Sequence, residues 1–375
     1  MPLSLEDVHA ALSTVQDPDL KQDLVSLRMI RAVESDLAGV RVTVELTTPA
    51  CPMKERIQSD IEAAIRAKAA ELGEGPPATI VVNFTADVRR GAGRVAGGGD
   101  GSAAGSSNPL PTVRQIVAVG AGKGGVGKST VSVNLAVGLA RTGARVGLLD
   151  ADIYGPSLPT MLGLEQIPAA AKGNTLMPFE VHGIKSMTIG KLVDADKALI
   201  WRGPMAHRAF QQLATQTEWG ELDYLVIDLP PGTGDVALTM SQLLPLSGAV
   251  VVCTPQRVAL DDARRAVRMF EQLGIPVLGV VENMSSFVAD DGREFDLFGK
   301  GGAETMAGTM GLPFLGSIPI HPELRIHSDD GTPLLNFRAG SALARSLEHV
   351  CGETARQLSI AAASAALKQP TLTVR

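Results

Sequence analysis

A glycine-rich stretch between an apolar segment and a helical pattern constrains this chain more than any other feature. Residues 122–129 read Gly-Lys-Gly-Gly-Val-Gly-Lys-Ser and fit the spacing G-x-x-x-x-G-K-[ST]. The apolar run 115–119 predicts a buried strand before the motif, and residues 129–141 predict a helix after it. A loop in this context surrounds phosphates with backbone N–H groups at a helix N-terminus. The sequence therefore predicts a phosphate-binding loop.

The residues of this loop have separate expected roles. The expected nucleotide contacts are Gly122, Lys123, Gly124, Gly125, Val126, Gly127, Lys128, Ser129 and Thr130. We expect Lys128 to reach the β- and γ-phosphates and the Ser129 hydroxyl to bind Mg²⁺. A second lysine is unnecessary for one nucleotide in one subunit. We therefore expect Lys123 to act across a homodimer interface, as an arginine finger does, which makes both lysines candidate catalytic residues.

A dinucleotide-binding fingerprint is the alternative interpretation of the same glycines. Residues 120–125 also fit G-x-G-x-x-G, and Asp150 ends the next strand, where a ribose-binding acid is expected. This alternative does not account for the lysine–serine pair at 128–129, so the phosphate loop is favoured.

An alternation of apolar strands and helices follows residue 113 and predicts an α/β fold. The expected strands are 115–119, 145–149, 224–227, 249–253, 277–281 and 314–317. Continuous apolar strands between helices indicate a mostly parallel sheet covered by helices on both faces, here a P-loop NTPase. Ligands of such sheets bind beyond the carboxyl ends of the strands, so residues distant in sequence are expected to meet there.

Carboxylates end two of these strands. Asp228 follows strand 224–227 and is expected to steady Mg²⁺, and Gly232 in the next turn to approach the γ-phosphate through its N–H. Asp150 is expected to bind the metal or brace the loop, and Asp152 to orient the attacking water. The alternative for Asp150 and Asp152 is that both acids cap a turn.

Two further segments are candidates near the nucleotide. Residues 281–283 end a later strand, and Asn283 is expected there to read the edge of the base. The guanine-reading pattern N-K-x-D is missing from the sequence, which favours ATP over GTP. Residues 201–205, Trp-Arg-Gly-Pro-Met, are interpreted equally as a partner surface or as core and turn.

Composition excludes several functional classes. A net charge of −6 and an aromatic content of 3% argue against a nucleic-acid partner. No run reaches the roughly 20 apolar residues of a membrane span, and residues 1–12 lack the apolar core of a signal peptide. Cys51, Cys253 and Cys351 are widely separated and odd in number, which favours a reducing cytoplasm over a disulfide framework.

The chain is expected to contain two domains. Residues 1–90 follow an α-β-β-α-β order and predict a small α+β domain. Residues 91–112 are rich in Gly, Ala and Ser and predict a flexible linker. Residues 113–375 form the expected ATPase domain.

These motifs together resemble a known family. Residues 122–130 resemble the deviant Walker A motif of the MinD/ParA class. Residues 150–157, 201–205, 228–235 and 281–285 resemble the Mrp/ApbC family of iron–sulfur cluster carrier ATPases. Residues 17–20 and 47–52 resemble the small SufT-like iron–sulfur assembly domain. The resemblance implies a homodimer with facing nucleotide sites, ATP hydrolysis, and transfer of an iron–sulfur cluster to apoproteins and assembly factors.

One departure from the family concerns the cluster ligands. Many members carry C-P-x-C shortly after the E-N-M-S motif, whereas this chain has no cysteine between residues 284 and 293. Because clusters favour thiolate ligands, the best remaining candidate is Cys51, in a proline-flanked turn before a helix. A purely structural thiol is the alternative. An ATP-switched spatial regulator and a nucleotide-gated scaffold are the competing functions, although residues 359–367 lack the basic face of a membrane anchor.

Overall fold

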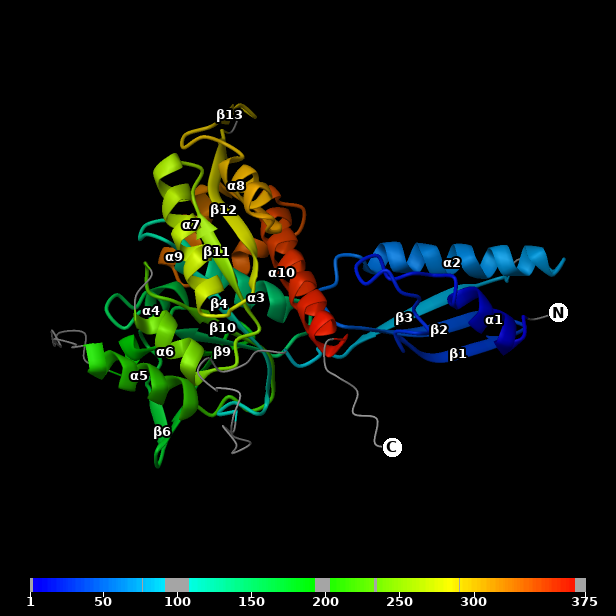
Figure 1. The fold of residues 1–375 in the computed structure, drawn as a ribbon, viewed down its shortest axis with the longest axis horizontal. Coiled ribbons are helices and arrows are strands. Elements are labelled where there is room, and N and C mark those ends of the chain that lie inside the picture. The colour runs from blue at the N-terminus through cyan, green and yellow to red at the C-terminus, as the bar shows by residue number, and fades with distance from the viewer. Residues whose placement is uncertain are drawn as a thin grey trace. The chain divides into compact units, whose positions relative to one another are not determined.

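The computed structural model describes residues 3–75, 77–91, 108–192, 203–232, 235–289 and 291–367 (Figure 1). Most of the expected linker and the Trp201–Arg202 pair therefore lie outside the described residues. The chain divides into two compact units, one that extends to Arg89 and one formed by Arg90–Ala366. In the part of the chain that the model describes, no helix is both long and apolar enough to cross a bilayer.

The N-terminal unit has the expected α-β-β-α-β order. Its elements are α1 (Leu5–Leu12), β1 (Ile30–Asp36), β2 (Gly39–Leu46), α2 (Lys54–Glu71) and β3 (Ile80–Ala86). Strand β2 is central and pairs antiparallel with β1 and parallel with β3. Alternate residues of β2, such as Val42 and Val44, share a core with Ile57, Ile61 and Ile65 of α2. Apolar residues recur every two positions in β2 and every four positions in α2, so each element has one apolar face.

The second unit alternates strands and helices from residue 113 onward. Its central elements are β4 (Val113–Gly120), α3 (Lys128–Arg141), β5 (Val146–Asp150), β10 (Leu222–Asp228), β11 (Gly248–Cys253), β12 (Val277–Val288) and β14 (Phe314–Ile320). Other helical elements are α4 (Leu158–Met161), η1 (Ile189–Lys191), α5 (Gly203–Thr215), α6 (Asp235–Leu243), α7 (Arg257–Gln272), α8 (Gly302–Met310), α9 (Pro322–Asp329), η2 (Pro333–Phe337) and α10 (Ala342–Leu367).

The main sheet is mostly parallel, as expected. Its order is β13-β12-β11-β4-β10-β5-β9-β8, with β14 beside β12. Antiparallel pairing joins β8 (Phe179–Val181) to β9 (Ile184–Met187), and β12 to β13 (Glu294–Phe295). The other pairs are parallel. Every strand expected from the sequence is present in this sheet.

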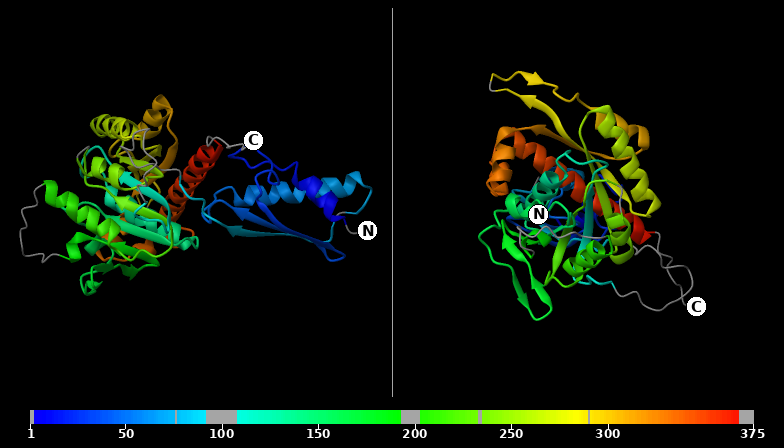
Figure 2. Two further views of the ribbon diagram at one scale, coloured as in Figure 1. Left: turned by 60° about the horizontal axis from the view of Figure 1, so that its bottom comes forward. Right: turned by 90° about the vertical axis from the view of Figure 1, so that its left-hand side faces the viewer.

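Helices cover both faces of the sheet (Figure 2). Helices α5–α8 share one core with alternate residues of β4 and β10, among them Ile116, Ala118, Leu225 and Ile227. Helix α3 contacts β4, β5 and β10. Since side chains alternate along a strand, Val117 and Val119 point to the face opposite Ile116 and Ala118.

The connection between β5 and α5 contains strands that the sequence pattern did not indicate. It holds β8 and β9 of the main sheet and a separate hairpin, β6 (Ala170–Lys172) with β7 (Thr175–Met177). These strands have three or four residues each, too few to display a period. Strand β9 pairs parallel with β5, and so extends the sheet beside Asp150.

The described residues at and next to both ends of the expected linker form hydrogen bonds within the second unit. The Arg90 guanidinium donates a hydrogen bond to the carbonyl of Pro111 at 2.6 Å. The Gly91 N–H donates to the carbonyl of Arg114 at 2.8 Å. Leu110 is buried in the core beneath helices α5–α8. Residues 108–112 thus pack with the ATPase domain in this structure.

Candidate nucleotide-binding site

Glycines set the backbone of the phosphate loop, which joins β4 to α3. Gly125 and Gly127 have φ angles of +79° and +78°, in the left-handed region that favours glycine. A Cβ on Gly122 would lie 2.1 Å from the carbonyl oxygen of Asp262 on α7. The loop can therefore keep this path only with glycine at these positions.

The lysine that follows these glycines is buried and paired with an acid. Lys128 Nζ lies 2.6 Å from Asp228 Oδ1, which also accepts a hydrogen bond from the Ser132 hydroxyl at 2.7 Å. Lys128 is 7% exposed and Asp228 is 0% exposed, so the pair is shielded from water. The strand end at Asp228 and the first two turns of α3 thus meet, as the topology predicted.

Asp150 lies beside Asp228 in the neighbouring strand, in direct register. Its Oδ2 accepts a hydrogen bond from the Thr188 hydroxyl at 3.0 Å, and its Oδ1 from the Asp152 N–H at 3.1 Å. Burial, together with the nearby charge of Asp228, raises the pKa of Asp150 to about 7. Asp150 is therefore positioned to bind a cation, or a proton in its absence.

The other two candidate catalytic residues are less buried. Asp152 Oδ1 accepts a hydrogen bond from the Gly155 N–H at 3.1 Å, and partial burial raises the pKa of its carboxyl. Lys123 is half-buried, and its ammonium has no hydrogen bond or ion pair within the described residues.

Asn283 and Gly232 have contacts that differ from the expected ones. The Asn283 amide donates to the carbonyl of Val126 at 2.8 Å and is buried against the phosphate loop, where it braces the backbone. The Gly232 N–H donates to the carbonyl of Ala121 at 3.1 Å, so in this structure it is not directed at a phosphate. Strand β12 also continues to Val288, so Asn283 lies within it and not at its end.

Two residues of the site, Ser132 and Thr188, were missed by sequence reasoning. Ser132 orients Asp228, and Thr188 orients Asp150. Met284, inside the 281–285 motif, has a φ angle of +55°, a strained conformation for a non-glycine residue, and the pairing of β12 with β14 is irregular between Asn283 and Phe287. Ser132 lies one helical turn beyond Lys128 and was detectable by that spacing, whereas Thr188 lies in no motif.

The donor set fits a hydrated divalent cation. Asp228 Oδ2 is buried and has no hydrogen-bond partner in the described part of the structure. Such an atom is costly unless water or a ligand reaches it. Hydroxyl and carboxylate oxygens are the ligands that Mg²⁺ prefers, and Ser129, Asp150 and Asp228 supply them around Lys128.

The three cysteines have different environments, and none forms a disulfide. Cys253 and Cys351 are buried, and burial raises the pKa of each thiol to about 12, which disfavours the thiolate. Cys51 is half-buried at the edge of the N-terminal core, and α2 begins three residues later at Lys54. No cluster of three or more His, Cys, Asp or Glu side chains suited to a metal occurs among the residues described.

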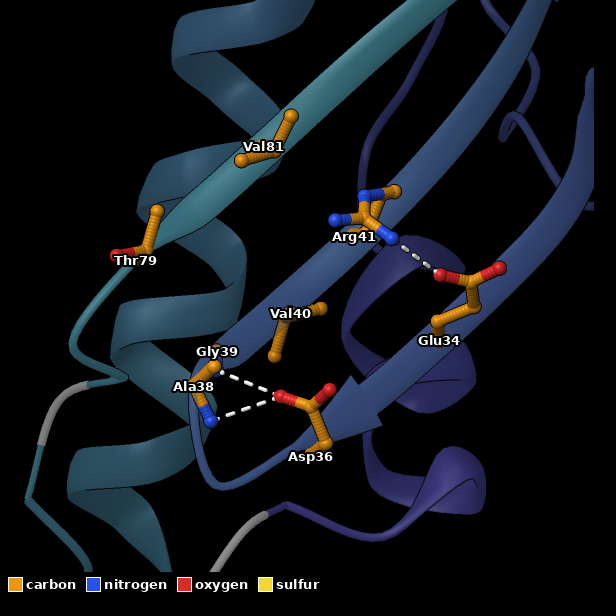
Figure 3. Close-up of a pocket in the computed structure, with 8 residues that line it drawn as sticks. All are labelled: Glu34, Asp36, Ala38, Gly39, Val40, Arg41, Thr79 and Val81. Carbon is orange, nitrogen blue, oxygen red and sulfur yellow. Dashed lines mark hydrogen bonds and ion pairs between the residues drawn. The ribbon is translucent and has the colours of Figure 1, made fainter.

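A hollow on the N-terminal unit lies at the β1–β2 turn (Figure 3). Its wall contains the Arg41–Glu34 ion pair, and Asp36 accepts hydrogen bonds from the N–H groups of Ala38 and Gly39. These interactions stabilise the turn. The hollow is at the start of β2, about 20 Å along the sheet from the turn that carries Cys51.

The fold and this arrangement define a P-loop nucleotide-binding protein. The family model described as NUBPL iron-transfer P-loop NTPase matches residues 112–355, and the model described as iron-sulfur cluster assembly protein matches residues 5–73. The chain belongs to the family of NUBPL-type iron-transfer P-loop NTPases.

Similar proteins carry related names. The iron-sulfur cluster carrier protein of Synechocystis is 44% identical over 96% of this chain and 99% of its own length. That of Deinococcus radiodurans is 47% identical over 93% and 94%. A nucleotide-binding protein of Archaeoglobus fulgidus, solved with ADP and cobalt, is 41% identical, covers 60% of this chain and 89% of its own, and has a TM-score of 0.54.

Proposed function

We propose that this protein is an ATPase that carries iron–sulfur clusters and transfers them to apoproteins. The observation that carries the proposal is the convergence of Lys128, Asp228 and Asp150 beneath a glycine loop whose conformation only glycine permits. Membership of a family whose relatives are named cluster carriers supports the choice of cargo.

Binding of ATP would begin with a change of partner for Lys128. Its ammonium leaves Asp228 Oδ1 for the β- and γ-phosphates, while the Ser132 hydroxyl stays on Asp228. Ser129, Asp228 and Asp150 would hold Mg²⁺, which supplies charge neutralisation on the phosphate oxygens. Asp152, at the rim of the site, then orients the water that attacks the γ-phosphate.

We further propose that the working unit is a homodimer in which Lys123 acts on the nucleotide of the opposite subunit. The unpaired, half-buried ammonium supports this role. A cation that arrives from outside the subunit stabilises the charge that develops on the transferred phosphoryl group. Hydrolysis would then depend on dimer formation, whereas nucleotide binding would not.

The cluster is cargo in this proposal, and Cys51 is its proposed protein ligand. The two other thiols are buried with a pKa of about 12, so Cys51 is the thiol best able to ligate iron. One thiolate does not complete a cluster, so the remaining ligands would come from a second chain or a small thiol. The odd number and wide separation of the cysteines support a reducing compartment such as the cytoplasm.

Two measurements test this function: transfer of the cluster to an apoprotein, and the rate of ATP hydrolysis. Anaerobically reconstituted protein should contain iron and sulfide and should load an apo-ferredoxin, and Lys128→Ala should abolish ATP turnover. A protein that hydrolyses ATP without binding iron would overturn the carrier role. Pelleting with liposomes and with DNA in the presence of ATP would reveal a spatial regulator instead.

A further inference from the structure

A chain of buried side-chain hydrogen bonds connects the phosphate-loop helix to the C-terminal part of the ATPase domain. Asn134 of α3, Asn336 of η2 and His327 of α9 are each at most 7% exposed. Asn336 Nδ2 donates to Asn134 Oδ1 at 2.8 Å, and Asn336 Oδ1 lies 2.8 Å from His327 Nδ1. None of these three residues belongs to the nucleotide motif.

The direction of every bond in this chain is fixed by its first member. Asn134 Nδ2 donates to the carbonyl of Thr130 at 2.8 Å, and a carbonyl can only accept. Asn134 Oδ1 must therefore accept from the Asn336 amide, which leaves Asn336 Oδ1 as an acceptor. His327 Nδ1 consequently carries a proton. Every bond in this chain therefore joins one donor to one acceptor. Such a matched chain favours a single arrangement of α3, η2 and α9.

The Thr130 end of this chain lies in the first turn of α3. That turn also carries Lys128 and Ser129, the residues proposed to bind phosphate and Mg²⁺. A side-chain bond to the carbonyl four residues earlier competes with the helix's own backbone bond and can bend the helix, so Asn134 influences the geometry of this turn. Burying three polar side chains costs desolvation free energy that apolar side chains of the same shape would not. Packing alone therefore does not explain why polar residues occupy these positions.

The α9–η2 region also packs against the segment that follows Asp152. Gly331, two residues after α9, packs directly on Gly163 at the end of α4, and a Cβ on Gly331 would lie 2.3 Å from the Gly163 nitrogen. Helix α4 follows the Asp150–Asp152 strand end and also contacts α9 (Figure 1). The α9–η2 block, residues 322–337, therefore holds both the phosphate-loop helix and the segment of the proposed water-orienting acid.

We propose that Asn336 and His327 are positioning residues for ATP hydrolysis. Through Asn134 they fix the first turn of α3, and through the Gly331–Gly163 contact the same block fixes the segment after Asp152. They set the placement of Lys128 and Ser129 relative to Asp152 without touching the nucleotide. This inference rests on the proposed ATPase function.

Matched variants separate positioning from simple stability. Asn336→Leu removes both bonds at the centre of the chain, and His327→Leu removes its last donor. His327→Asn is the conservative partner, because its amide nitrogen replaces Nδ1 as a donor. Phe337→Leu is the control, since Phe337 is buried in the same η2 against Gly138 and makes no bond of the chain.

We expect Asn336→Leu and His327→Leu to lower kcat about 10- to 100-fold and to weaken ADP binding by a smaller factor, because Lys128 and Ser129 are also proposed to contact the β-phosphate and its metal. His327→Asn should recover most of the activity. Phe337→Leu should lower Tm while kcat below Tm stays at the wild-type value. Loss of kcat in Phe337→Leu to the same extent, or wild-type kcat in Asn336→Leu, would overturn the inference.

Hydrogen exchange provides a readout that does not depend on turnover. Amides in residues 128–138 and 153–164 should exchange faster in Asn336→Leu and His327→Leu than in wild type, His327→Asn or Phe337→Leu. If wild-type protein hydrolyses no ATP, the proposed function fails, and this exchange pattern still decides whether the chain holds both segments. Unchanged exchange in both leucine variants would contradict that role.

Discussion

The ammonium of Lys128 lies 2.6 Å from the carboxylate of Asp228, and both side chains are buried. Removal of one member of such a buried pair leaves an uncompensated charge, which costs about 3–5 kcal/mol. We expect Lys128→Met to lower the free energy of unfolding of the nucleotide-free protein by about that amount. Adding Asp228→Asn should recover much of the loss. Urea denaturation measures both, and equal stabilities of the single and double variants would contradict the prediction.

Asp150 should make stability depend on pH near neutrality. Its pKa is raised from 3.8 to about 7, so the folded state binds the proton more tightly than the unfolded chain. The resulting stabilisation is fully present below about pH 4 and is lost as the pH rises through about 7, with an upper limit of about 4 kcal/mol. Without Mg²⁺ and nucleotide, wild-type stability should therefore fall between pH 5 and 8 relative to Asp150→Asn. Parallel stability curves for the two proteins would refute this assignment.

Lys123 should be needed for turnover and dispensable for binding. Because an arginine finger contributes about 10³-fold or more to the rate, we expect Lys123→Ala to reduce kcat by about 10³-fold with an unchanged Kd for ATP. The decisive control mixes Lys123→Ala with Lys128→Ala and verifies mixed dimers by tag capture. One subunit then supplies a competent nucleotide site and the other supplies Lys123, so turnover should partly return. Mixed dimers without activity would exclude action across the interface.

The cysteines should separate into one functional thiol and two structural ones. We expect Cys51→Ser to lose bound iron and transfer after anaerobic reconstitution, with little change in Tm. Cys351→Ser should retain iron but lose about 1–3 kcal/mol of stability, because its side chain is buried against Gly138 of α3. Iron and sulfide analysis decides between them. Equal iron content in wild type and Cys51→Ser would remove Cys51 from the proposal.

The parts of the site that could be predicted are those whose backbone conformation or position is set by the local sequence. Glycines at 125 and 127 permit the left-handed backbone, and an apolar strand that ends in Asp228 places a carboxylate at the sheet edge. These properties are local, so a sequence pattern expresses them. The general fold followed because each long strand of the main sheet has a continuous apolar run.

The parts that were missed depend on contacts between distant segments. Asn283 binds the phosphate loop through the carbonyl of Val126, and the two residues are 157 positions apart in the sequence. Thr188 reaches Asp150 because the short strand β9 pairs with β5, and no motif marks that pairing. The Gly232 N–H has a carbonyl partner within its own subunit, which no spacing indicates.

The hydrogen bonds of Arg90 to Pro111 and of Gly91 to Arg114 have a consequence for the glycine-rich insert between them. The residues at both ends of this insert are hydrogen-bonded within the ATPase unit. Changing the number of residues between positions 92 and 107 should therefore alter the stability of the ATPase unit only slightly, because the entropy of loop closure grows slowly with loop length.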